Sequence, residues 1–215
     1  MSRRIDFSLY LITDRSILPP GSSLPEAVRE ALEGGVKCVQ LREKDLSPGS
    51  LFSLALELRD LTRRYGAKLL INDRADVALA CDADGVHLTS ASLPVSAVRG
   101  MLGPEPLIGV SAHRLDEILK AGQEGADFAT FGPVYFTPSK AAYGPPVGLE
   151  KLREVCLRAP LPVFALGGVK LGRLGELMAA GAAGVALISA ILSFPDPRGQ
   201  AQSFLQHLSR PRLGD

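Results

Sequence analysis

A loop after the apolar run 128–131 carries two hydroxyl groups and one ammonium group, on Thr137, Ser139 and Lys140. The run ends at Gly132-Pro133, because proline lacks a backbone donor and glycine lacks a side chain that could continue a buried strand. Hydroxyl donors and a mobile cation are groups that bind phosphate in proteins. A solvated loop in which the hydroxyls only brace the backbone would have the same composition, so the rest of the chain must decide.

Polar residues also follow the other apolar runs, at the points where those runs end. They are Gln40, Arg42 and Lys44; Asn72 and Asp73; Thr89 to Ser92; and Ser111 and His113. The last two runs end in Gly167-Gly168 and Ile188-Ser189, each of which leads into a helix. The two glycines let the backbone approach a ligand closely, and N–H groups at the start of a helix bind phosphate. If the side chains of Arg42, Lys44 and Lys140 lie close together, they favour a small-molecule substrate with several negative charges. Such a substrate would carry more than one phosphate.

Three titratable residues each allow two interpretations. Asp73 fits either a cap for the helix that follows it or a ligand for Mg²⁺, which prefers carboxylate oxygen and typically bridges to substrate phosphates. His87 lies inside an apolar run, where a hydrogen-bonded structural imidazole is the simpler interpretation. His113 stands just after a run and is open to a catalytic role.

These residues need a scaffold that brings the ends of several apolar runs together. Eight such runs recur, at 9–13, 38–42, 68–72, 85–88, 107–111, 128–131, 162–166 and 184–189. Between them lie segments with helical spacing, such as 24–32 and 48–65, often opened by proline or closed by glycine. Near-continuous apolar runs are typical of parallel strands buried on both faces.

The alternation predicts a single (β/α)8 TIM barrel, with residues 1–215 as one domain. Active sites in this fold lie at the C-terminal ends of the strands, which is where the polar set falls. A doubly wound open sheet is the alternative, because closure of the sheet cannot be seen in a sequence.

The composition excludes several classes of partner. The net charge is +1, from 24 basic and 23 acidic side chains, which argues against nucleic acid and against a membrane surface as partners. No apolar stretch approaches the roughly 20 residues that span a bilayer. Cys38, Cys81 and Cys156 lack metal-ligand spacing, and buried thiols suit a reducing cytoplasm, so we expect a cytoplasmic protein that is not exported. The sequence leaves open whether the chain forms a homo-oligomer.

Seven segments, taken in order, resemble the thiamin-phosphate synthase family, which also contains the TenI-type thiazole tautomerases. They are Leu9-Tyr-Leu-Ile-Thr-Asp14, Val39-Gln-Leu-Arg-Glu-Lys44, Leu70-Ile-Asn-Asp-Arg74, Ala83-Asp-Gly-Val-His-Leu88, Ile108-Gly-Val-Ser111, the loop 131–140, and Ala165-Leu-Gly-Gly-Val169 with Val185-Ala-Leu-Ile-Ser-Ala190. The resemblance implies an enzyme that joins hydroxymethylpyrimidine diphosphate to thiazole phosphate and releases diphosphate.

The resemblance also implies roles for individual residues. Gln40, Arg42, Lys44 and Asn72 would hold the pyrimidine diphosphate, with Asp73 on its Mg²⁺. Ser111 and Lys140 would stabilise the departing diphosphate. Thr137, Ser139, Gly168, Ile188 and Ser189 would bind the thiazole phosphate.

One segment departs from the synthase pattern. A second metal-binding Asp is expected after the fourth apolar run, and Ser92 stands there instead. The segment 86–92 is more similar to the tautomerase branch, in which His113 would be the base that moves a proton on the thiazole ring. Retention of Asp73, Lys44 and Lys140 favours the synthase. A catalytically idle relative that binds a thiamin precursor is a third hypothesis.

Overall fold

Eight parallel strands form a closed barrel in the computed structural model, which describes residues 5–137 and 145–209. The strands are β1 (Leu9–Ile12), β2 (Cys38–Leu41), β3 (Lys68–Asn72), β4 (Gly85–Leu88), β5 (Leu107–Ala112), β6 (Phe128–Phe131), β7 (Val163–Leu166) and β8 (Gly184–Leu187). Each strand pairs with the next, and β1 also pairs with β8, where Leu9 lies opposite Val185. The predicted TIM barrel is confirmed, and the open-sheet alternative is wrong.

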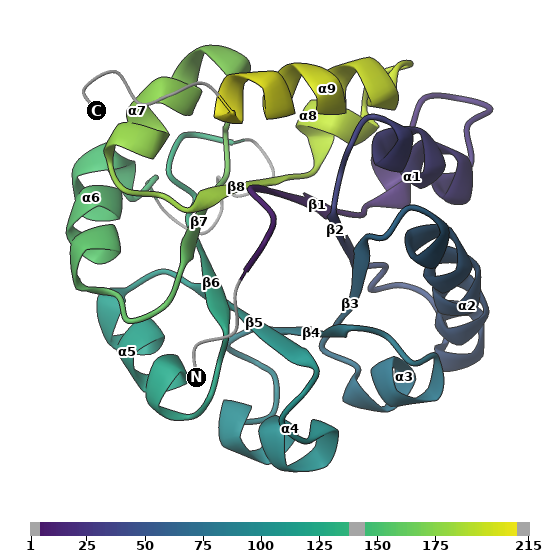
Figure 1. The fold of residues 1–215 in the computed structure, drawn as a ribbon, viewed down its shortest axis with the longest axis horizontal. Helices are drawn as coiled ribbons and strands as arrows, with labels where there is room; N and C mark the ends of the chain where they lie inside the picture. Colours follow the sequence, from purple (N-terminus) through teal and green to yellow (C-terminus); the bar gives the residue numbers. More distant parts are fainter. Residues whose placement is uncertain (1–4, 138–144, 210–215) are drawn as a thin grey trace.

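Helices follow the strands and surround the barrel, as Figure 1 shows. They are α1 (Leu24–Glu33), α2 (Pro48–Arg64), α3 (Ala75–Ala80), α4 (Val95–Leu102), α5 (Leu115–Gln123), α6 (Gly148–Arg158), α7 (Leu174–Ala179), α8 (Ser189–Leu192) and α9 (Pro197–Leu208), with 3-10 turns η1 (Arg15–Ile17) and η3 (Leu171–Arg173). Ser23, Ser47 and Asp196 cap α1, α2 and α9 by accepting a hydrogen bond from a backbone N–H of the first turn. The eighth strand is shorter than predicted, because Ser189 begins the additional short helix α8.

Alternate side chains of each strand point into the barrel and toward the helices, which creates two separate cores. The inner core contains Phe7, Tyr10, Phe128 and Phe164, whose rings pack at centroid distances of 5.2–6.4 Å. The outer core lies between strands and helices and is mainly aliphatic. This aromatic packing fills the inside of the barrel, and active sites in this fold lie at the C-terminal mouth.

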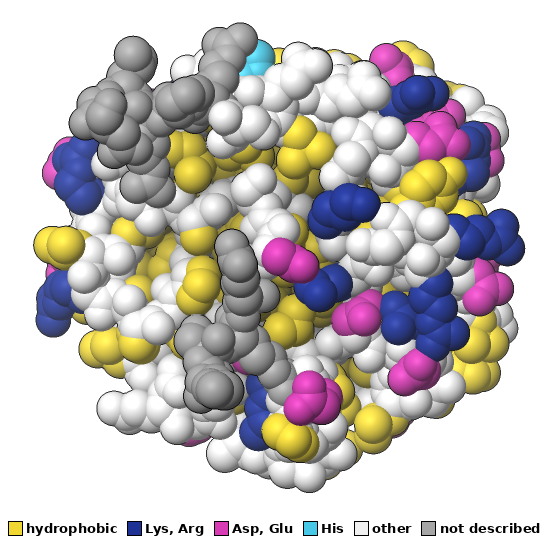
Figure 2. Space-filling view, viewed as in Figure 1, with side chains coloured by type: hydrophobic (Ala, Val, Ile, Leu, Met, Phe, Trp, Pro, Cys, Tyr) yellow, Lys and Arg dark blue, Asp and Glu magenta, His cyan; other side chains and the backbone are white. Residues whose placement is uncertain are grey.

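The surface carries charges of both signs. Figure 2 shows Lys and Arg side chains interspersed with Asp and Glu side chains over α1 and α2. Within residues 5–137 and 145–209, no helix is long and apolar enough to cross a membrane. Cys38 and Cys81 are buried free thiols, as predicted, and the free thiol of Cys156 is half-buried.

Candidate active site

Five adjacent strands make one sector of the inner wall polar near the mouth of the barrel. Its members are Gln40 on β2, Asn72 on β3, His87 on β4, Ser111 on β5 and Thr130 on β6. Barrel register brings them together, since Asn72 pairs with His87 and Ser111 pairs with Thr130. The inner positions of β1, β7 and β8 at this level are the apolar residues Ile12, Leu166 and Ala186. The mouth therefore suits a ligand with an apolar ring and a strongly polar end.

Gln40 presents a buried acceptor without a partner. Its Nε2 donates to Asn72 Oδ1 at 3.1 Å. Its Oε1 is buried and has no hydrogen-bond partner within the described part of the chain. A buried acceptor that is left unpaired costs about 1–3 kcal/mol, so a ligand N–H at this point would recover that free energy.

Two cations follow β2. Arg42 is half-buried and Lys44 is exposed, and neither side chain has an ion pair or hydrogen bond with any residue in 5–137 or 145–209. Burial lowers the pKa of His87 to about 3, and the positive charge of Arg42 adds to this effect. The Arg42 guanidinium therefore acts on the polar sector of the mouth, where it can meet an anionic ligand.

Glu43, between these cations, is buried and fixes the backbone that carries them. Its Oε1 accepts from Thr13 Oγ1 at 2.7 Å, and its Oε2 accepts from the backbone N–H and the guanidinium of Arg15. Thr13 Oγ1 in turn accepts from the N–H of Arg42 at 2.9 Å. Sequence reasoning missed this role; the signal was an acidic residue placed between two cations at the end of a buried strand.

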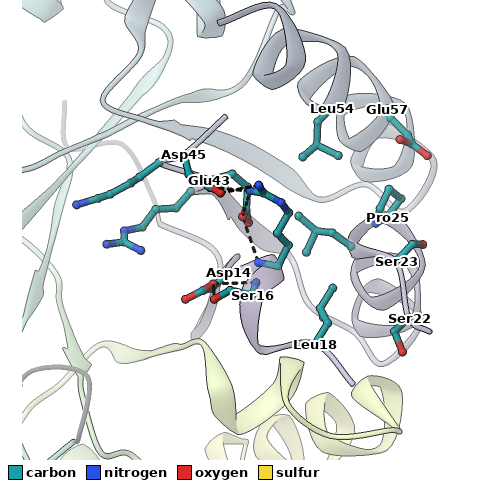
Figure 3. Close-up of a pocket in the computed structure, with 14 residues that line it drawn as sticks. Asp14, Ser16, Leu18, Ser22, Ser23, Pro25, Glu43, Asp45, Leu54 and Glu57 are labelled. Atoms are coloured by element: carbon teal, nitrogen blue, oxygen red, sulfur yellow. Dashed lines mark hydrogen bonds and ion pairs between the residues drawn. The ribbon is translucent and has the colours of Figure 1, made fainter. Parts of the chain in front are cut away.

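A cleft of about 710 Å³ opens beside Glu43 and its hydrogen-bond partners, between the loop after β1 and helix α2. Figure 3 shows Asp14, Glu43 and Asp45 at one end of the cleft, and Pro25 and Glu57 at the other. Arg42 and Lys44 also line it. Arg42 and Lys44 are therefore accessible from this cleft as well as from the mouth of the barrel.

Asp73 follows β3 at the rim and does not cap the next helix. The N-cap position of α3 is Arg74, and no side chain caps the helix there. The Asp73 carboxylate makes no hydrogen bond within the described ranges, and its backbone has a φ of +64°, which is unfavourable for a residue other than glycine. Strained residues of this kind cluster at functional sites.

The Ser92 hydroxyl is hydrogen-bonded to Thr89 in its own turn. Its Oγ accepts from the N–H of Thr89 at 2.8 Å and lies 3.2 Å from Thr89 Oγ1. No group of three or more His, Cys, Asp or Glu side chains that could hold a metal occurs among the residues with described positions. Asp73 is thus the free carboxylate that the predicted metal position retains.

The loops after β6 and β7 pack on each other. Gly168 has a φ of +65°, and a Cβ there would lie 2.7 Å from Phe136 O and from Tyr135 Cβ. Thr137 is half-buried in the same loop, whereas Ser139 and Lys140 lie outside the described residues. Ile188 and Ser189 form the start of α8 at the end of β8.

His113 stands at the rim between β5 and β6. Its Nδ1 donates to the carbonyl oxygen of Gly132, and its backbone N–H donates to Glu117 at 2.7 Å. Because a carbonyl can only accept, Nδ1 carries a proton, and in the neutral ring the lone pair is on Nε2. His113 is therefore chemically able to act as a base.

A known protein family matches most of this chain. The family model described as thiamine monophosphate synthase matches residues 9–191. The chain belongs to this family. It is 55% identical over 212 residues to a Geobacter sulfurreducens protein named "Putative thiamine-phosphate synthase", covering 99% of both chains. It is 43% identical over 201 residues to the thiamine-phosphate synthase of Methanospirillum hungatei, covering 93% of this chain and 97% of that one.

A solved structure is also similar. Thiamine phosphate pyrophosphorylase from Pyrococcus furiosus superposes with a TM-score of 0.84 at 37% identity, covering 94% of this chain and 95% of that chain. The family assignment and the barrel thus agree between sequence and structure.

Proposed function

We propose that this protein is a thiamin-phosphate synthase, a transferase that couples hydroxymethylpyrimidine diphosphate to thiazole phosphate and releases diphosphate. The observation that carries the proposal is that Arg42 and Lys44 make no ion pair or hydrogen bond with the described residues and lie at a mouth that is half polar and half apolar. Two cations suit a diphosphate, and the apolar half suits an aromatic ring. Relatives with 41–55% identity that are named as synthases support it.

The polar sector would bind the pyrimidine substrate. The unpaired Oε1 of Gln40 is an acceptor for the amino group of an aminopyrimidine, and Asn72 holds the Gln40 amide in place. Arg42 and Lys44 would contact the diphosphate. The buried carboxylate of Glu43 fixes the segment that carries both cations, so the protein has organised these charges before substrate binds.

In the reaction, the bond between the pyrimidine methylene carbon and the diphosphate oxygen breaks, and the thiazole nitrogen forms the new bond to that carbon. Negative charge gathers on the leaving diphosphate and positive charge on the pyrimidinylmethyl group. Arg42, Lys44, Lys140 and Ser111 would stabilise the leaving group. The protein needs no proton-transfer residue for this bond exchange.

The second substrate would bind across the mouth. Thr137, Ser139, Gly168, Ile188 and Ser189 would hold the thiazole phosphate. Support comes from Gly168, where the backbone passes so close to Tyr135 and Phe136 that no side chain fits. The N–H groups of Ser189 and Ala190 at the start of α8 have no acceptor among the described residues and can donate to an anion.

Mg²⁺ fits the proposal as an ion held chiefly by substrate. Asp73 supplies one free carboxylate, and the Ser92 hydroxyl is engaged with Thr89. Mg²⁺ commonly binds through one or two carboxylates together with substrate phosphates. When bound, it would neutralise charge on the diphosphate. A cytoplasmic location is part of the proposal and fits the three free cysteines.

The decisive experiment separates the synthase from the tautomerase. Purified protein is incubated with both synthase substrates and Mg²⁺, and separately with the unaromatised thiazole tautomer. We expect coupling that Asp73→Asn abolishes and His113→Ala changes little. Restoring the acid with Ser92→Asp should lower the Mg²⁺ concentration needed for half-maximal coupling.

The opposite ranking would overturn the proposal. If His113→Ala lowers tautomer turnover by 10²- to 10⁴-fold while Asp73→Asn has no effect, the protein is a tautomerase with His113 as base. Binding of the precursors without turnover in either reaction would indicate the idle binding protein.

A further inference from the structure

A chain of hydrogen bonds crosses the inside of the barrel and ends at Ser111. The Tyr10 hydroxyl lies 3.2 Å from His87 Nδ1, and His87 Nε2 lies 3.0 Å from Ser111 Oγ. Tyr10 is 0% and His87 is 1% exposed, whereas Ser111 is partly exposed. Only the Ser111 end of the chain can therefore reach a ligand in the mouth.

The donors and acceptors in this chain follow from the partners. Within the described residues, His87 Nδ1 is the one hydrogen-bond partner of the buried Tyr10 hydroxyl, so the phenol proton points to Nδ1. The Thr130 hydroxyl lies 3.5 Å from both His87 Nε2 and the carbonyl of Val110. Donation from the Tyr10 hydroxyl to Nδ1 leaves the proton of the neutral imidazole on Nε2.

With its proton on Nε2, the imidazole accepts from Tyr10 through Nδ1 and donates to Ser111 Oγ through Nε2. The Ser111 hydroxyl then has one lone pair occupied by His87, and its own proton is available to the mouth.

We propose that His87 is a positioning residue, anchored by Tyr10, that makes the Ser111 hydroxyl a dedicated donor to the diphosphate group. The inference rests on the proposed function for its ligand. With the other tautomer, Nε2 would accept a hydrogen bond from the Ser111 hydroxyl. The hydroxyl oxygen would then present a lone pair to an anion. The tautomer selected by Tyr10 thus decides whether Ser111 attracts or repels diphosphate.

The tautomer can be measured without any enzymatic activity. The chain has three histidines, so ¹⁵N-histidine NMR spectra are simple, and loss of signals in His87→Gln assigns His87. We expect an Nε2–H imidazole in the native protein and a mixture of tautomers in Tyr10→Phe. An Nδ1–H tautomer in the native protein would overturn the proposal.

The effect on Ser111 is tested by binding of inorganic diphosphate with Mg²⁺. We expect Ser111→Ala and His87→Leu each to raise Kd about tenfold, and the double variant to bind no worse than either. His87→Gln, which keeps an N–H near the Nε2 position, should recover part of the affinity. Additive losses, or a His87→Leu variant with native affinity and only a lower Tm, would assign His87 a purely structural role.

The two proposals fail in different ways. If the protein does not couple the two substrates, the synthase assignment falls, whereas the NMR spectra and diphosphate affinities still test the role of His87. If coupling is normal but the losses are additive, only the positioning role falls.

Discussion

At the scale of single residues, His87 links the site to the stability of the fold. Its pKa is lowered from 6.5 to about 3, first by burial and then by the charge of Arg42. Between these two values the unfolded chain binds a proton that the folded chain does not. The neutral imidazole therefore stabilises the fold fully above about pH 6.5, and this contribution is lost as the pH falls toward 3.

We predict a corresponding pH dependence. The free energy of unfolding of the native protein should fall below pH 6.5 by up to about 1.4 kcal/mol per pH unit through this group. The free energy of unfolding of His87→Gln should lack this pH-dependent contribution. The difference in the free energy of unfolding between the native protein and His87→Gln should therefore shrink as the pH falls. Urea unfolding at pH 7.5, 5.5 and 4.5 measures it. A difference that is constant with pH would contradict the assignment of a buried neutral imidazole.

Glu43 yields a second prediction at this scale. Glu43→Gln keeps the shape but removes the charge that holds Thr13 and Arg15, and hydrogen bonds to charged groups contribute about 1.5–3 kcal/mol. Because the segment 42–44 loses its anchor, KM for the pyrimidine diphosphate should rise about tenfold or more. Glu57→Gln, in the same cleft but exposed and without a hydrogen bond among the described residues, is the matched control. Equal kinetics in the two variants would remove Glu43 from the site.

At the scale of elements, the loops after β6 and β7 act as one unit. Tyr135 N–H donates to Gly167 O at 3.1 Å, and the guanidinium of Arg173 lies 4.0 Å from the centre of the Tyr135 ring. The Tyr135 hydroxyl donates to Glu176 of α7. Burial and the negative charge of Glu176 raise the pKa of this phenol. A change in one loop must therefore move the other.

Gly168→Ala tests this coupling. A Cβ at this position would meet Phe136 O and Tyr135 Cβ at 2.7 Å, so both loops must shift. We expect KM for thiazole phosphate to rise at least severalfold, and stability to fall by about 1 kcal/mol because φ is positive. Gly172→Ala, which has nothing within 4 Å of the added carbon, should behave like the native protein. Unchanged KM in Gly168→Ala would mean that this loop does not bind the phosphate.

The sequence predicted the strands and the polar strand ends because both depend on local pattern. Strands 68–72, 85–88 and 128–131 have the predicted bounds, and Gln40, Asn72 and Ser111 share one wall because the side chains of a strand alternate. The roles of Tyr10 and Glu43 could not be predicted in this way. Tyr10 contacts a residue 77 positions away and Glu43 contacts one 30 positions away, and only closure of the barrel brings them together.

At the scale of the whole molecule, the two ends of the barrel have different tasks. At the N-terminal end, Asp84 accepts from the N–H of Leu69 and pairs with Arg59, and Asp127 accepts from the N–H of Ile108 and pairs with Arg99. Each pair ties a helix to two neighbouring strands. We propose that residues 1–215 form one domain, because β1 pairs with β8 and the barrel cannot close without both ends of the chain.

Arg99 provides the test of this division between the two ends. Its guanidinium donates to the carbonyls of Gly103, Pro106 and Gly125 and to Asp127, and the two side chains are 20% and 11% exposed. Arg99→Met removes these hydrogen bonds and the ion pair with Asp127, so the free energy of unfolding should fall by about 3 kcal/mol. Because active sites lie at the opposite end of this fold, kcat and both KM values of the folded enzyme should stay unchanged.

The exposed ion pair of Arg114 with Asp116 is the matched control, and Arg114→Met should change neither stability nor kinetics measurably. Chemical denaturation and steady-state kinetics on the same preparations provide both readouts. A loss of kcat in Arg99→Met at a temperature where the protein remains folded would show that the two ends of the barrel are coupled. The proposed separation between a stabilising N-terminal end and a reactive C-terminal mouth would then be wrong. The hydrogen bonds of Arg99 would also determine the position of Ser111, through strand β5.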